Sequence, residues 1–232
     1  MMKTYMDKES KNIVDWHRVN HVLLDMDGTL LDRYFDDYFW EHLVPEKYAE
    51  KNNITFGKAK EELFKKYKAH EGTLNWTDLD FWSGELDLDI PVLKEQIKHL
   101  IEAHPYVEDF LSMLRRNSKK VSLVTNAHYK SIDIKLKKTA IGGYFNHVIS
   151  SFDVGFPKET QEFWKEAERI LEFNKESTLL IDDTLVVLKT AKVYGIKYLI
   201  LKIRPNSRLK PDSVQPQEEF TEVADFKDLT QM

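Results

Sequence analysis

The chain has 232 residues, a net charge of −5 and no cysteine. This length is enough for one large domain or two modest domains with a buried core. The absence of cysteine excludes disulfide bonds and thiolate chemistry, and the mild charge, without a dense run of lysine and arginine, argues against a nucleic acid polymer as a partner. The short basic segment 135–138 is expected to lie on the solvent-facing side of a helix.

The N-terminal segment, residues 1–16, is polar and of mixed charge, and it lacks the apolar core of a signal peptide. No run in the chain approaches the roughly 20 apolar residues that cross a bilayer. We therefore expect a cytoplasmic protein with no membrane partner. Nothing in the composition indicates an oligomeric state.

The first predicted strand, residues 22–24, runs directly into the sequence Asp25-Met26-Asp27-Gly28-Thr29. A strand that ends at Asp25 would point its carboxylate into a cleft, and a turn at Gly28 would bring Asp27 back toward the same place. One carboxylate could then act as a nucleophile while the other moves protons, and their charge calls for a bound cation. The alternative for such a sequence on its own is an ordinary Asp-Gly turn.

Residues 33–104, called the helical insert below, contain no strand candidate. Apolar residues recur in the insert at helical spacing: Phe39, Leu43 and Tyr48; Ala59, Leu63 and Tyr67; and Val92, Leu93, Ile97, Leu100 and Ile101. This pattern predicts a helical domain inserted after the first strand. The core domain would then consist of residues 1–32 and 105–232.

Strand and helix patterns alternate from residue 105 onward. Helical spacing marks residues 107–114 and 163–171, and the further strand candidates are residues 121–124, 148–150, 179–181 and 198–201. This alternation predicts an α/β fold with a doubly wound parallel sheet, in which ligands bind beyond the carboxyl ends of the strands. The tail from Arg204 onward, with its three prolines, is expected to be loop-like.

Polar residues follow three of these strand candidates in chain order. Thr125-Asn126 comes after the second strand, Lys158 stands in the sequence Gly155-Phe156-Pro157-Lys158, and Asp182-Asp183 comes after the fourth. Each alone would indicate a turn, a surface cation or an acidic helix start. Together with the first motif they resemble the four motifs of the haloacid dehalogenase-like hydrolases, and this resemblance covers nearly the whole chain.

The resemblance implies a Rossmann-like core whose helical insert is a mobile cap with hinges near residues 31–32 and 104–105. It implies a small phosphomonoester as substrate, with Asp25 as the nucleophile that forms an aspartyl-phosphate. Asp27 would act first as general acid and then as general base. Thr125, Asn126 and Lys158 would hold or orient the phosphoryl group.

The expected cofactor is Mg²⁺, which prefers hard oxygen ligands. By resemblance its ligands are the Asp25 carboxylate, the backbone carbonyl of Asp27 and a carboxylate of the Asp182-Asp183 pair. Of that pair, Asp182 is favoured as the direct ligand. His128, close to Thr125 in sequence, is expected at the surface or behind the site.

Segments of the insert and of the second motif are similar to the bacterial GMP/IMP 5′-nucleotidases; these segments are Phe35–Trp40, Leu74–Trp76, Phe81-Trp82 and Thr125–His128. This resemblance implies a purine nucleoside monophosphate as substrate. Trp40 and Trp76 are candidates for stacking on the base, with helix packing as the alternative. Two other functions stay open: a sugar-phosphate phosphatase or phosphomutase, and a non-catalytic phosphate-binding protein.

Overall fold

The computed structural model describes residues 13–209 and 219–230. They form one sheet of six parallel strands in the order β3-β2-β1-β4-β5-β6. The strands are β1 (His21–Leu24), β2 (Lys120–Thr125), β3 (His147–Ser150), β4 (Thr178–Asp182), β5 (Tyr198–Lys202) and β6 (Thr221–Val223). The chain winds outward in both directions from β1 and β4, which confirms the predicted doubly wound α/β fold.

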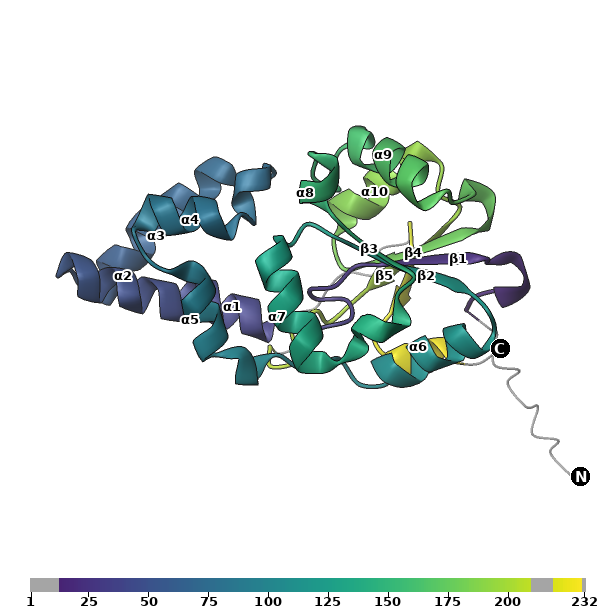
Figure 1. Ribbon diagram of the computed structural model, residues 1–232, viewed down its shortest axis with the longest axis horizontal. Coiled ribbons are helices and arrows are strands. Elements are labelled where there is room, and N and C mark those ends of the chain that lie inside the picture. Colours follow the sequence, from purple (N-terminus) through teal and green to yellow (C-terminus); the bar gives the residue numbers. More distant parts are fainter. Residues whose placement is uncertain (1–12, 210–218, 231–232) are drawn as a thin grey trace, which may run out of the picture.

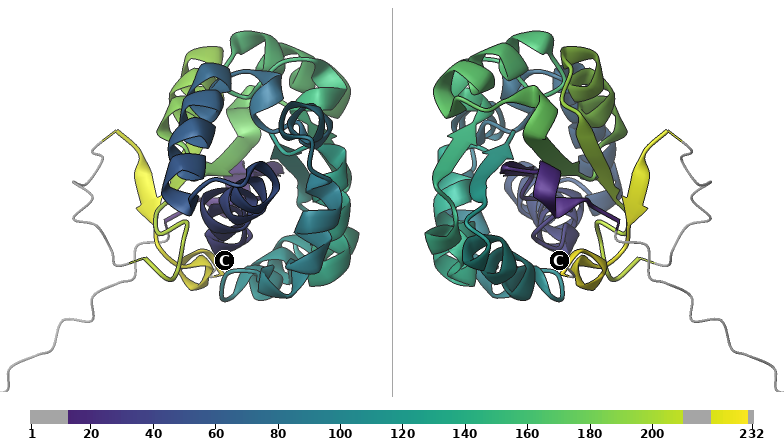
Figure 2. Two further views of the ribbon diagram at one scale, coloured as in Figure 1. Left: turned by 90° about the vertical axis from the view of Figure 1, so that its left-hand side faces the viewer. Right: turned by 90° about the vertical axis from the view of Figure 1, so that its right-hand side faces the viewer.

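Five of these strands were predicted, and β6 was missed because the tail was expected to be loop-like. Residues Thr221–Val223 pair with the outer strand β5, and the two side views show this strand, in yellow, at one edge of the sheet (Figure 2). Two of the tail's prolines, Pro211 and Pro216, lie outside the described residues. A three-residue edge strand gives too short a pattern to recognise by alternation.

Helices cover both faces of the sheet. Figure 1 shows α8 (Ser151–Val154), α9 (Gln161–Leu171) and α10 (Leu185–Tyr194) on one side and α6 (Val107–Arg116) and α7 (Tyr129–Thr139) on the other. Alternate residues of β1 therefore enter two separate cores. Leu24 packs in the cluster that contains Phe110 of α6, whereas Leu23 packs in the cluster that contains Trp164 of α9.

Between β1 and α6 the chain forms helices, apart from single bridges at Leu31 and Ala103. They are α1 (Tyr34–Tyr38), the π-helical turn η2 (Phe39–Leu43), α2 (Val44–Asn52), α3 (Phe56–His70), α4 (Leu79–Leu86) and α5 (Ile90–Gln96), with the 3₁₀ turns η3 (Leu74–Trp76) and η4 (Lys98–Leu100). Several begin at a side-chain cap, for example Thr55 Oγ1, which accepts from the backbone N–H of Lys58.

The helical insert lies at the left of Figure 1, beyond the end of the sheet from which β1 leads into α1. Its two connections to the sheet run side by side, because the backbone N–H of His104 donates to Leu30 O at 2.9 Å and Leu31 bridges to Ala103. These contacts lie where the hinges were predicted. The independence of residues 33–104 as a domain stays a prediction.

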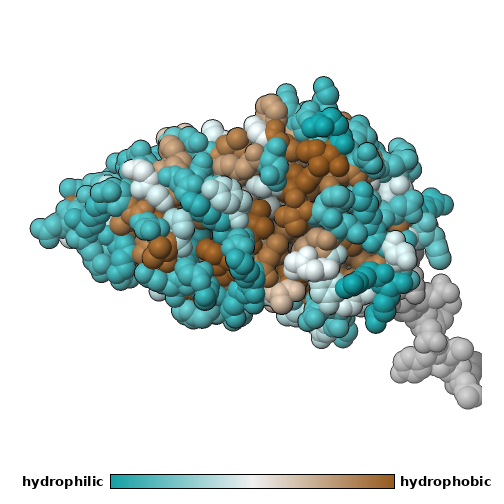
Figure 3. All heavy atoms as spheres, in the orientation of Figure 1, coloured by the Kyte–Doolittle hydropathy of each residue, from teal (hydrophilic) through white to brown (hydrophobic). Residues whose placement is uncertain are grey.

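The surface of the insert is largely hydrophilic on the face shown in Figure 3, and apolar residues gather toward the middle of that face. Among the described residues, no helix combines the length and apolar character needed to cross a membrane.

Candidate active site

Three strand ends bring polar side chains to one edge of the sheet. Leu24 pairs with Leu123 and with Ile181, so the residues that follow β1, β2 and β4 reach this edge together. Asp25 directly follows β1, and its backbone N–H donates to Ile181 O at 3.0 Å. Thr125 is the last residue of β2 and Asp182 the last residue of β4.

Gly28 makes the turn that brings the chain back over this edge. Its φ of +88° lies in the region that favours glycine. A Cβ here would also stand 2.3 Å from Asp183 Oδ2 and 2.9 Å from Pro205 Cβ. No other residue type could occupy this position without displacing the site.

Lys158 joins two of the aspartates. Its Nζ donates to Asp25 Oδ1 at 2.5 Å and to Asp182 Oδ2 at 2.7 Å, and the residue is 3% exposed. Burial opposes its charge, but these two carboxylates outweigh burial and raise the pKa of Lys158 above its usual range. The site therefore contains a buried cation that contacts both Asp25 and Asp182.

Carboxylate oxygens of Asp25, Asp182 and Asp183 all lie within 4.8 Å of one another. Burial raises the pKa of all three carboxyl groups. A neighbouring carboxylate raises each pKa further: Asp182 raises that of Asp25, Asp183 that of Asp182, and Asp25 that of Asp183. Asp25 Oδ2 is buried and has no hydrogen-bond partner among the described residues. This donor set, with an unpartnered hard oxygen, suits a divalent cation such as Mg²⁺.

The two aspartates of the fourth motif differ in how their oxygens are used. Asp182 Oδ1 accepts from the backbone N–H of Thr184 at 2.9 Å, and its Oδ2 accepts from Lys158. Asp183 Oδ1 accepts from the Thr184 hydroxyl at 3.2 Å, and its Oδ2 lies 3.3 Å from Arg33 Nη1. Asp182 is thus committed to strong contacts on both oxygens, whereas the contacts of Asp183 are longer.

Asn126 fixes the loop that carries Lys158. Its Oδ1 accepts from the backbone N–H of Lys158 at 2.9 Å, and its Nδ2 donates to both carboxylate oxygens of Glu159 at 3.1 and 2.9 Å. Thr125 is 2% exposed, and its hydroxyl accepts from the backbone N–H of Ala127 at 3.1 Å. Both residues line the same cavity as Asp25.

Asp27 lies against a buried lysine that the sequence analysis placed in solvent. Lys135 of α7 is 1% exposed, and its Nζ lies 2.6 Å from Asp27 Oδ1 and 2.6 Å from Asp36 Oδ2. The expectation that residues 135–138 lie on a solvent-facing side was therefore wrong for Lys135. Its position, three residues after the buried Ile132 and four after the buried Ser131, is the helical spacing that indicates burial.

Burial raises the pKa of Asp27, and the nearby Asp36 carboxylate raises it further, whereas Lys135 opposes both effects. Asp36 is thus the neighbouring carboxylate that raises the pKa of Asp27. Asp36 itself has its pKa held below the usual range despite burial, by Lys135 and by Lys94 of α5. Sequence reasoning missed both Asp36 and Lys94 at this site.

A family model for haloacid dehalogenase-like hydrolases matches residues 19–195. The chain belongs to this family. The predictions of the family and of an enzyme are confirmed. This hydrolase is also 36% identical over 202 residues, 87% of its chain and 91% of theirs, to the GMP/IMP nucleotidase YrfG of Escherichia coli (strain K12) and of Shigella flexneri.

Solved structures show the same fold. The HAD phosphatase from Thermococcus onnurineus is 23% identical with a TM-score of 0.77, and the match covers 91% of this hydrolase and 96% of that chain. The HAD-hydrolase YfnB from Bacillus subtilis, in a structure bound to magnesium, is 21% identical with a TM-score of 0.61 and coverage of 91% and 97%.

The helical insert of the hydrolase forms the far wall of the cavity above Asp25, which has a volume of about 750 Å³. Both tryptophans predicted to bind substrate, Trp40 and Trp76, line it, and Trp76 is 42% exposed. Tyr67 stands between them, with ring centroids 5.6 Å from Trp40 and 6.3 Å from Trp76. The Tyr67 hydroxyl is buried without a partner among the described residues.

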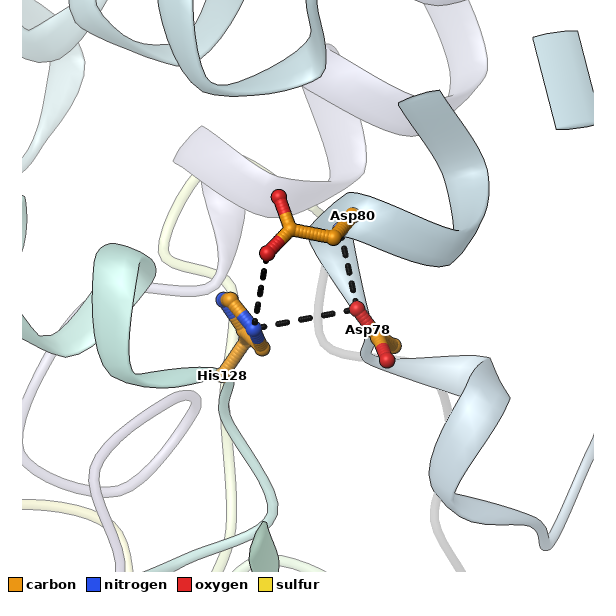
Figure 4. Close-up of side chains that lie close together, drawn as sticks. All are labelled: Asp78, Asp80 and His128. Carbon is orange, nitrogen blue, oxygen red and sulfur yellow. Dashed lines mark hydrogen bonds and ion pairs between the residues drawn. The ribbon is translucent and has the colours of Figure 1, made fainter. Parts of the chain in front are cut away.

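The insert also contacts the core of the hydrolase beside the second motif. Figure 4 shows His128 directed toward Asp78 and Asp80 at the start of α4, with Nε2 at 3.7 Å from Asp78 Oδ1 and 3.8 Å from Asp80 Oδ2. The Thr77 hydroxyl donates to Asn126 O at 2.5 Å. His128 is 3% exposed, so it is not a surface residue, and it lines the same cavity as Asp25.

The side chains of His128, Asp78 and Asp80 are close enough to share a metal ion, but Asp78 already accepts hydrogen bonds from the backbone. Its Oδ1 accepts from the backbone N–H groups of Asp80 and Phe81 at 2.8 and 3.1 Å and so caps α4. We read the group as a contact between insert and core.

Proposed function

We propose that this hydrolase is a Mg²⁺-dependent phosphomonoesterase that acts on purine nucleoside monophosphates through an aspartyl-phosphate on Asp25. The observation that supports this most is the arrangement at the sheet edge: Asp25 contacts the buried cation of Lys158 with one oxygen and leaves the other unpartnered. A carboxylate held in this way can attack phosphorus while the lysine offsets charge on the phosphoryl oxygens.

The reaction divides into two displacements. In the first, a carboxylate oxygen of Asp25 bonds to phosphorus, the ester P–O bond breaks, and Asp27 gives its proton to the departing alkoxide. In the second, Asp27 takes a proton from water, the water oxygen bonds to phosphorus, and the bond between phosphorus and Asp25 breaks to release phosphate. The raised pKa of Asp27 favours the protonated form that the first step needs.

Three groups would hold Mg²⁺ in this scheme: the Asp25 carboxylate, the backbone carbonyl of Asp27 and the Asp183 carboxylate. We now favour Asp183 over Asp182 as the direct ligand, because both oxygens of Asp182 are already engaged by Thr184 and Lys158. When bound, the ion would supply positive charge beside the phosphate oxygens and keep Asp25 ionised. Asp182 would position Lys158.

Two features support a purine nucleotide as the substrate. The cavity of about 750 Å³ falls within the usual ~300–1,000 Å³ range of small-molecule sites. Its far wall carries Trp40, Tyr67 and Trp76, and an aromatic ring stacked on a base contributes about 1–3 kcal/mol. The named activity of the YrfG relatives is for GMP and IMP, which agrees with this assignment.

A phosphate-release screen with Mg²⁺ tests the proposal. The substrates would be GMP, IMP, AMP, UMP and glucose 6-phosphate, and the Asp25→Asn variant would serve as the control for contaminating phosphatases. We expect the highest kcat/KM for GMP or IMP. If kcat/KM for glucose 6-phosphate exceeds that for GMP and IMP by more than about tenfold, which corresponds to ~1.4 kcal/mol, the result would instead support the sugar-phosphate alternative.

A further inference from the structure

Four charged side chains form a chain of ion pairs that leads from Asp27 into the helical insert. Lys135 Nζ lies 2.6 Å from Asp27 Oδ1 and 2.6 Å from Asp36 Oδ2, and Lys94 Nζ donates to Asp36 Oδ1 at 2.7 Å. Asp27 and Lys135 belong to the core, whereas Asp36 in α1 and Lys94 in α5 belong to the insert. All four line the cavity above Asp25.

The two lysines are among the most completely buried large side chains of the described residues, at 2% exposure for Lys94 and 1% for Lys135. Removing an ammonium group from water is costly unless carboxylates and other favourable contacts offset the loss. Two lysines and two aspartates together carry no net charge when both carboxyl groups are ionised. The four charges therefore balance once Asp27 has given up its proton, and in that state Asp27 completes the buried group.

Aromatic rings hold the ammonium groups in place. Lys94 Nζ lies 4.7 Å from the ring centroid of Phe39 and 4.9 Å from that of Phe35, and Lys135 Nζ lies 5.4 Å from Phe35. These distances are within the range of cation–π attraction. These contacts add to the attraction of Asp36 and favour the observed positions of both ammonium groups.

We propose that Lys135 positions Asp27 for proton transfer, and that Asp36 and Lys94 hold Lys135 in place from the insert. This inference rests on the proposed function, in which Asp27 is the general acid and base. Lys135 contacts the carboxyl group of Asp27 and fixes it at the cavity wall. When Asp27 has given its proton to the alkoxide, the new carboxylate faces an ammonium group 2.6 Å away, so its negative charge is offset at once.

Leaving-group dependence gives a test that a merely structural role of Lys135 would not affect. Phenyl phosphate and p-nitrophenyl phosphate have nearly the same shape, but the basic phenolate needs a proton from the enzyme far more than nitrophenolate does. Because both substrates give the same aspartyl-phosphate, kcat/KM reports the first displacement alone. We expect Lys135→Met to lower kcat/KM for phenyl phosphate at least about tenfold more than kcat/KM for p-nitrophenyl phosphate. Lys137→Met, an exposed position on the same helix, should change neither.

Asp27→Asn separates failure of this inference from failure of the proposed function. If Asp27 is the general acid, Asp27→Asn will show the same selective loss on phenyl phosphate. Should Asp27→Asn lower kcat/KM for both substrates equally, the acid role itself is wrong. Should Asp27→Asn be selective while folded Lys135→Met slows both substrates equally or neither, the positioning role of Lys135 is overturned.

A second variant covers the case in which Lys135→Met does not fold. The double variant Asp36→Asn with Lys94→Met removes one carboxylate and one ammonium group, so the buried net charge is unchanged, and Lys135 keeps its contact with Asp27. We expect a selective loss of at least about threefold on phenyl phosphate, with p-nitrophenyl phosphate hydrolysis unchanged. If the variant melts like the parent and its kcat/KM changes equally for both substrates, the insert does not hold Lys135 for catalysis.

Discussion

Magnesium should stabilise this hydrolase, and the size of the effect can be worked out from the carboxylate cluster. Burial and neighbouring carboxylates raise the pKa of Asp25 and Asp183 from their ordinary value of 3.8 to about 7. The metal-free folded protein therefore binds more protons than the unfolded chain between about pH 4 and 7. Its stability should fall as the pH rises through that window.

Magnesium binds the ionised carboxylates, so its affinity should increase as the pH rises from about 4 to 7. At pH 7.5 and about 100 times its Kd, a ligand stabilises the folded state by about 2.7 kcal/mol. In a chain of this size that corresponds to a rise of roughly 5–11 °C in Tm. At pH 5.5, where two protons must be displaced, binding should weaken by about 100-fold or more, and the same Mg²⁺ concentration should stabilise by less than about 1 kcal/mol.

The assay is thermal melting with Mg²⁺ and with chelator at the two pH values. Asp183→Asn should remove the Mg²⁺ shift and melt no lower than the parent in chelator, because it relieves repulsion in the cluster. Asp133→Asn, an exposed carboxylate on α7, should behave like the parent. A full shift in Asp183→Asn together with its loss in Asp182→Asn would refute the choice of Asp183, and no shift in the parent would refute the metal site.

Three further predictions concern single residues. Asp25→Asn should abolish phosphate release from GMP with little change in Tm, because the amide keeps the shape of the nucleophile but not its reactivity; retained turnover would contradict the mechanism. Trp76→Ala should lower kcat/KM for GMP about 5- to 150-fold, the equivalent of ~1–3 kcal/mol of stacking, and leave kcat/KM for p-nitrophenyl phosphate within about twofold; equal losses on both substrates would indicate a packing role. Burial lowers the pKa of His21 to about 4. As the pH falls below 6.5, His21 therefore becomes protonated in the unfolded chain and stays neutral in the folded protein. Urea titrations should show that the parent loses about 2 kcal/mol more than His21→Gln between pH 8 and 5; parallel losses would contradict the neutral, buried state of His21.

The strands and their ends could be predicted because the signals are local. Residues 22–24 and 179–181 are buried on both faces of the sheet, so these runs are continuously apolar, and the change to polar residues at Asp25 and Asp182 marks the edge of the sheet. No strand order was predicted. The expectation that Asp25, Thr125 and Asp182 converge required only that each comes at the carboxyl end of a parallel strand in one sheet.

The ion pairs that join Asp27 and Asp36 to the two lysines could not be predicted in the same way, because the lysines come from distant parts of the chain. Lys135 and Asp36 are 99 residues apart, and Lys94 and Asp36 are 58 apart. A lysine in a helix usually lies in solvent, and only helical spacing relative to Ile132 distinguishes Lys135 from its exposed neighbour Lys137. Helical spacing can indicate that a face of a helix is buried, but it cannot identify the carboxylates that contact that face.

The distribution of these charges between insert and core bears on how the insert could open. Asp36 and Lys94 both belong to the insert, and Asp27 and Lys135 both belong to the core. If the insert moves away from the sheet, each part therefore keeps one carboxylate and one ammonium group, and neither is left with an unpaired buried charge, whose cost would be several kcal/mol. Among these four charged side chains, opening then breaks only the contact between Lys135 and Asp36, at 2.6 Å in this structure. On this reasoning Asp27 would be fully positioned when the insert is closed over the substrate, and less firmly held when it is open.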